Sequence, residues 1–115
     1  MTQSSTSEAT PFLFACDLSA LSREQRTAHT ELVSRLFGSL VQEARELPDG
    51  FAYRFAGEHY AHVATFMTNE RQCCPFLRFK LEVAPHHGAI WLHLTAEGEV
   101  KPFLCEELGP SHSER

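Results

Sequence analysis

Residues 78–83 alternate apolar and polar side chains over their whole length, and residues 90–95 do so except at Trp91. This alternation is typical of a half-exposed β-strand, because successive side chains of a strand point to opposite faces of a sheet. The tetrapeptide between them, Pro-His-His-Gly at residues 85–88, begins and ends with turn-forming residues. The pattern therefore predicts a β-hairpin, so the chain has to fold around a sheet.

Two amphipathic helices are predicted before this hairpin. The first begins after Ser22, whose capping-box spacing with Gln25 marks a helix start, and it ends at the Pro-Asp-Gly turn of residues 48–50. Its apolar side chains recur with a period of about 3.6 over residues 32–44. The second helix is predicted at residues 58–73.

The remaining elements place the chain in the α+β class. Residues 11–18 are compatible with a first strand, residues 51–56 alternate in the manner of a strand, and residues 100–108 predict a short closing helix. The predicted order is β-α-β-α-β-β-α. Helical connections early in the chain and a hairpin near its end indicate a mixed sheet with helices packed on it, completed by a C-terminal hairpin-helix.

Length and composition are typical of one small domain. The chain has 115 residues, of which 43% are hydrophobic, and neither an internal repeat nor a linker divides it. We therefore expect a single domain at residues 11–109. The polar ends, residues 1–10 and 110–115, are expected to be disordered tails.

Charge and hydropathy exclude several classes of partner. The net charge is −5 and Lys and Arg form no cluster, which argues against direct binding to DNA or RNA. No apolar run approaches the roughly 20 residues that span a bilayer. The first residues also lack the basic and apolar regions of a signal peptide. A cytoplasmic location is therefore expected, with Cys16, Cys73, Cys74 and Cys105 as reduced thiols.

The adjacent cysteines Cys73 and Cys74 are the most unusual chemical feature of the chain. The simplest interpretation is a packing role, since free cysteine is among the most frequently buried residue types. Alternatively, the two thiolates bind a soft metal or metalloid ion, with Cys105 or Cys16 as a third ligand. A redox pair is least favoured, because neighbouring Cα atoms are only about 3.8 Å apart and ordinary disulfides span about 4.4–6.8 Å.

The phase of the second helix separates the two cysteines. At about 100° per residue, Cys74 falls with Tyr60 on the expected core face, whereas Cys73 borders a polar stripe beside Glu70. That stripe also contains His62. Because each helical residue rises about 1.5 Å, His62 lies about 16 Å from Cys73 along the axis, too far to share one ion with it.

The segment at residues 70–77, Glu-Arg-Gln-Cys-Cys-Pro-Phe-Leu, resembles a motif of small uncharacterised bacterial proteins. The likeness continues through residues 79–92 to residues 101–104, and covers roughly residues 51–108. Similar segments are found in the C-terminal extension of some mercury-resistance-type (MerR-like) regulators. The resemblance implies a sensing or binding module more than an enzyme. The chain lacks a helix-turn-helix segment, so a transcription-factor role does not follow.

No glycine-rich phosphate loop, nucleophile elbow or His-Glu-X-X-His helix is present, so no catalytic residue is assigned and an enzyme is the less favoured class. The sequence predicts a soft metal or metalloid ion bound through Cys73 and Cys74, with Cys105 as the third ligand. The alternative is a ligand-free interaction or oligomerisation module with packing cysteines. In that case Phe76, Phe79 and Trp91 would contribute to a homodimer contact.

Overall fold

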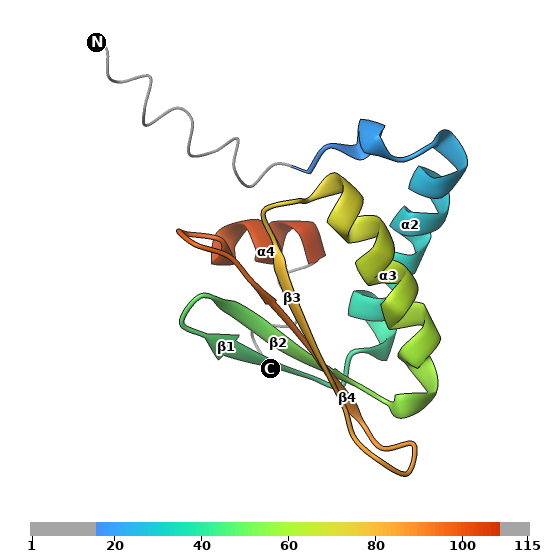
Figure 1. Ribbon diagram of the computed structural model, residues 1–115, viewed down its shortest axis with the longest axis vertical. Helices are drawn as coiled ribbons and strands as arrows, with labels where there is room; N and C mark the ends of the chain where they lie inside the picture. Colours follow the sequence, from blue (N-terminus) through green and yellow to red (C-terminus); the bar gives the residue numbers. More distant parts are fainter. Residues whose placement is uncertain (1–15, 109–115) are drawn as a thin grey trace.

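The strands form one antiparallel sheet, on which the helices pack (Figure 1). In the computed structural model, which describes residues 16–108, the strand order is β1-β2-β4-β3. The strands are β1 Glu43–Leu47, β2 Gly50–Phe55, β3 Arg78–Val83 and β4 Ile90–Thr95. The α+β class and the hairpin of the last two strands are confirmed. The expected mixed sheet is wrong, because every neighbouring pair within the described residues is antiparallel.

The first helix ends earlier than its apolar period predicts. α2 spans Arg23–Arg35, begins with the predicted capping box at Ser22, and continues as a short π-helix, η2, over Leu36–Leu40. Residues 43–47 then form β1 instead of more helix. The physical reason is the two-residue turn between β1 and β2, which brings the backbone of residues 43–47 into register with β2 and gives its polar groups partners in the sheet.

The first described residues do not form a strand. Of the predicted strand at residues 11–18, residues 11–15 lie outside the described residues. Cys16 and Asp17 are in no strand, and Leu18–Ala20 form a 3-10 turn, η1, whose start is capped by the Asp17 side chain. The first described element of regular length is therefore α2.

The helices enclose the core against one face of the sheet. α3, at Tyr60–Cys73, follows the 3-10 turn η3 at Gly57–His59 and lies beside α2, and α4 spans Lys101–Leu108 (Figure 1). The predicted second and closing helices are thus confirmed. Alternate side chains of the two central strands are buried between the layers: Phe51, Tyr53, Phe55, Ile90, Leu92 and Leu94.

One hydrophobic core joins the sheet to all three helices within residues 16–108. The tails predicted at residues 1–10 and 110–115 lie outside this part of the chain. None of the helices in the described part has the length and apolar character needed to cross a membrane.

Replacing Gly50 with alanine is expected to lower the free energy of unfolding by about 3 kcal/mol. A Cβ atom at this position would lie 1.9 Å from the carbonyl oxygen of Leu94, so β2 and β4 would have to move apart. Urea denaturation followed by circular dichroism measures the change.

Gly38→Ala is the matched control for this substitution. A Cβ atom added at Gly38 meets no atom within 4 Å from outside its own helical turn in the described chain. Because alanine has the higher helix propensity, Gly38→Ala is expected to stabilise the protein by about 0.5–1 kcal/mol. Equal stability of Gly50→Ala and the wild type would contradict the close approach of β2 and β4.

Candidate metal centre

The buried face of α3 overlaps only in part with the face that its apolar residues predict. The buried side chains of this helix are Val63, Phe66, Glu70 and Cys73. Tyr60, expected on the core face, is instead 49% exposed. Cys74 is buried as expected, but Cys73 is buried with it, so the expected division between a core-facing Cys74 and a polar-stripe Cys73 is wrong. A helical pattern fixes which residues share a face, but the contact with α2 decides which face is covered.

The end of α3 lies against the first described residues of the chain. The backbone N–H of Cys74 caps the helix, and Pro75 follows, which disfavours further helical geometry. The backbone N–H of Asp17 donates a hydrogen bond of 2.7 Å to the carbonyl of Cys73. This contact holds Cys16 and Asp17 beside the two adjacent cysteines.

Cys16 and Cys74 are joined by a disulfide, with their Cα atoms 4.6 Å apart. The expectation that all four cysteines are reduced thiols is therefore wrong for this pair. The two residues are 58 positions apart in the sequence, so no local spacing could have indicated the bond. Cys73 and Cys105 take no part in a disulfide.

Cys73 is a buried thiol next to this disulfide. Its Sγ lies 3.7 Å from the Sγ of Cys74, and its side chain is only 1% exposed. Burial, followed by the negative charges of Glu70, Glu107 and Asp17, raises the pKa of the Cys73 thiol to about 11. The thiol is therefore protonated at neutral pH, which makes it a weak nucleophile.

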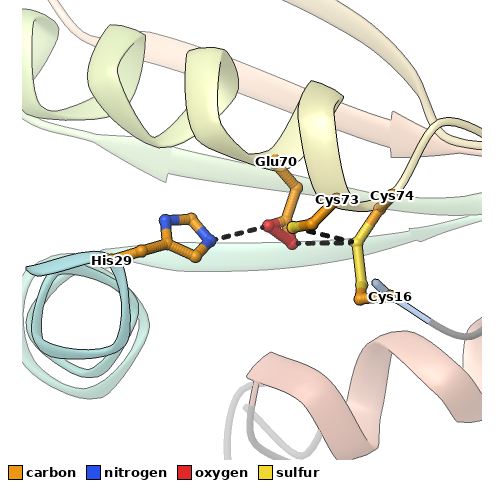
Figure 2. The surroundings of a disulfide bond; sticks show 5 residues. All are labelled: Cys16, His29, Glu70, Cys73 and Cys74. Atoms are coloured by element: carbon orange, nitrogen blue, oxygen red, sulfur yellow. Dashed lines mark hydrogen bonds and ion pairs between the residues drawn. A yellow bond between two sulfur atoms is a disulfide. The ribbon is translucent and has the colours of Figure 1, made fainter. Parts of the chain in front are cut away.

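A buried carboxylate–histidine pair adjoins the sulfur atoms (Figure 2). The Oε1 of Glu70 lies 2.9 Å from the Nε2 of His29, and both residues are at most 4% exposed. The other carboxylate oxygen, Oε2, lies 3.5 Å from the Sγ of Cys74. His29 comes from α2, and its ring stacks on Phe66 of α3 with the ring centroids 5.7 Å apart. Its Nδ1 is buried without a hydrogen-bond partner among the described residues.

Three sulfur atoms and one carboxylate oxygen thus form one cluster. The ligand atoms of Cys16, Glu70, Cys73 and Cys74 all lie within 4.8 Å of one another. Within residues 16–108 they form the one group of three or more His, Cys, Asp or Glu side chains that is this close. The structure brings the predicted Cys73 and Cys74 together here. The predicted third ligand, Cys105, is on α4, partly buried, and is not among these four residues.

Two members of this environment were not predicted as functional residues. Glu70 shares a helical face with Cys73, so its position beside the sulfur atoms follows from the sequence, but its burial does not. His29 is 41 residues away from Glu70, and no motif connects the two. For Cys16, the sequence indicated only that it was one of two possible third ligands, beside Cys105.

Comparison of the chain with protein-family models, with curated proteins and with solved structures finds no match. The function is therefore inferred from the chemistry of the site.

Proposed function

We propose that this protein binds a soft metal or metalloid ion through the thiolates of Cys16, Cys73 and Cys74. The supporting observation is that these three sulfur atoms and a carboxylate oxygen of Glu70 lie within 4.8 Å of one another. Thiolates select soft ions over hard ones, and a set of three suits an ion that accepts trigonal sulfur coordination. Trivalent arsenic and Hg(II) are the ions that we expect to bind most tightly.

The charges around Cys73 favour a bound cation over a reactive thiolate. Glu70, Glu107 and Asp17 each raise the pKa of the Cys73 thiol through their negative charge. The same charges would attract a positive ion. A metal cation such as Hg(II) that binds Cys73 must displace the thiol proton, so its binding releases protons and weakens as the pH falls. Arsenous acid instead exchanges its hydroxyl groups for the thiols and releases water.

Reduction of the Cys16–Cys74 disulfide is a condition of this function, because thiolates are the ligands of soft ions. We therefore propose a cytoplasmic location, where thiols are kept reduced. Glu70, held by His29, would either supply a fourth donor or accept a proton from a thiol.

The burial of the cysteines supports a second candidate, a ligand-free interaction or oligomerisation module. Cys73 and Cys74 are 1% and 0% exposed, as packing residues would be. In this alternative their sulfur atoms serve only the core, and the homodimer contact through Phe76, Phe79 and Trp91 stays a prediction. The two candidates differ in whether the reduced protein binds an ion.

Titration of the fully reduced protein separates them. Arsenite, Hg(II), Cu(I) and Zn(II) are added in turn while thiolate absorption is followed in the wild type and in Cys16→Ser, Cys73→Ser and Cys74→Ser. One ion per chain is expected. Because losing an outer-shell partner already costs about 10–100-fold in metal affinity, each ligand variant is expected to lose more than about 100-fold.

Cys105→Ser is titrated in the same way, because its ion affinity distinguishes Cys105 from Cys16 as the third ligand. Our geometry predicts that this variant binds as the wild type does. Circular dichroism of each variant verifies that it is folded. Binding that is unchanged in Cys73→Ser and Cys74→Ser would rule out the ion site and leave the packing role.

A further inference from the structure

We infer that the Cys16–Cys74 disulfide is the closed state of this ion site, so that oxidation and ion binding exclude one another. The inference rests on the proposed function and adds its regulation. The disulfide contains two of the three sulfur donors. A sulfur atom in a disulfide carries no negative charge and is a much poorer ligand than a thiolate. An ion and an oxidant therefore compete for the same two atoms.

The position of Cys74 makes this competition direct. Its Sγ is bonded to Cys16, lies 3.7 Å from the Sγ of Cys73, and lies 3.5 Å from a carboxylate oxygen of Glu70 (Figure 2). The four donor atoms are already close together in the oxidised protein. Reduction therefore converts the disulfide into two ligands without requiring α3 to move.

Oxidation by a low-molecular-weight disulfide, such as oxidised glutathione, accounts for all atoms and electrons. Cys16 is partly exposed whereas Cys74 is fully buried, so the oxidant meets Cys16 first. The Cys16 thiolate attacks one sulfur atom of the oxidant, forms a mixed disulfide and releases one thiolate. The Cys74 thiolate then attacks the Cys16 sulfur atom and expels the second. The protein loses two electrons, and the oxidant becomes two thiols.

Cys73 stays out of this exchange for two reasons. The structure places Cys74, and not Cys73, in the bond with Cys16, and the Cys73 side chain is only 1% exposed to an oxidant. A bond to its neighbour Cys74 would also require a strained disulfide, because adjacent Cα atoms are only about 3.8 Å apart. Cys73 thus keeps its thiol in both states, and the site switches between one and three thiol ligands.

The test compares two forms of the full chain. One sample is reduced with a phosphine and desalted, and the other is oxidised with oxidised glutathione and desalted. Arsenite binding is measured in both by calorimetry, and the disulfide is mapped by thiol alkylation and mass spectrometry. We expect stoichiometric binding by the reduced protein and none by the oxidised protein, in which Cys16 and Cys74 are linked. Protein loaded with arsenite is expected to resist oxidation.

Cys73→Ser is the matched variant, since it should still form the Cys16–Cys74 disulfide although it lacks one ion ligand. Equal arsenite binding by the oxidised and reduced wild type would overturn the inference and leave the proposed function intact. A disulfide between other cysteines in the oxidised protein, such as Cys73 and Cys74, would also overturn the inference and leave the proposed function intact. Failure of the reduced wild type to bind any ion would overturn both, while the mapped disulfide would still report the redox chemistry.

Discussion

Replacing His29 with leucine is expected to lower the free energy of unfolding by about 3–5 kcal/mol, the usual cost of leaving a buried carboxylate without its partner. His29 is 4% exposed and Glu70 is 1% exposed, and their nitrogen and oxygen atoms are 2.9 Å apart. Leucine fills much of the space of the imidazole but offers no hydrogen bond. The Glu70 carboxylate would then be buried without its partner, next to apolar rings and sulfur atoms.

Two further variants separate the lost pair from lost packing. Glu70→Gln keeps the shape of the side chain and a hydrogen bond to His29, so it is expected to cost less than half as much. The double variant His29→Leu with Glu70→Met replaces both polar groups by apolar ones of similar volume. Such replacements are often neutral, so the double variant should recover most of the loss.

Urea denaturation of all three variants, with the disulfide state held fixed, measures these differences. A loss below about 1 kcal/mol for His29→Leu would mean that the pair is not buried as described, because exposed pairs contribute about that much or less. A double variant less stable than His29→Leu would show that packing rather than charge dominates.

Phe37→Ala is expected to cost about 3–5 kcal/mol, the typical range for a phenylalanine deleted from a core. Phe37 is fully buried at the start of η2, and its ring centroid lies 5.0 Å from that of Tyr53, 5.7 Å from Phe55 and 5.2 Å from Phe66. These rings come from β2 and α3. The substitution therefore leaves a cavity where the sheet meets both long helices.

Phe37→Leu and Phe76→Ala serve as controls for this variant. Leucine keeps most of the buried volume, so Phe37→Leu should lose less than half as much stability. Phe76 is only partly buried against Phe103, so its loss should also be smaller. Thermal and urea unfolding rank the three variants. If Phe76→Ala were the most destabilising, the centre of the core would have to lie nearer α4.

Several elements were predictable because local patterns specify them. The alternation of residues 78–83 and 90–95 produced the hairpin, and Ser22 with Gln25 capped α2 as expected. The helix predicted at residues 58–73 was also correct to within a few residues. These features depend on neighbours in the sequence, so one short window contains the information.

The misassigned elements depended on partners in other segments, one of them near in the sequence and one far away. Residues 43–47 carry an apolar spacing that suits a helix, but pairing with β2 makes them a strand. Glu70 looks like a solvated helical residue until His29 reaches it from α2. An ionisable side chain is stable in a core only with a partner, and that partner is not visible in a local pattern.

The sequence alone determined the hairpin that constrains the fold, the helix that ends at Cys73, and the adjacency of Cys73 and Cys74. Only the tertiary structure decided that the sheet is antiparallel, that α3 buries the face containing Glu70, and that Cys16 completes a group of three sulfur atoms. The physical reason is the distance along the sequence over which each kind of interaction acts. Dihedral preferences and side-chain periodicity act over a few residues, whereas burial and ligand geometry depend on which distant segments pack together.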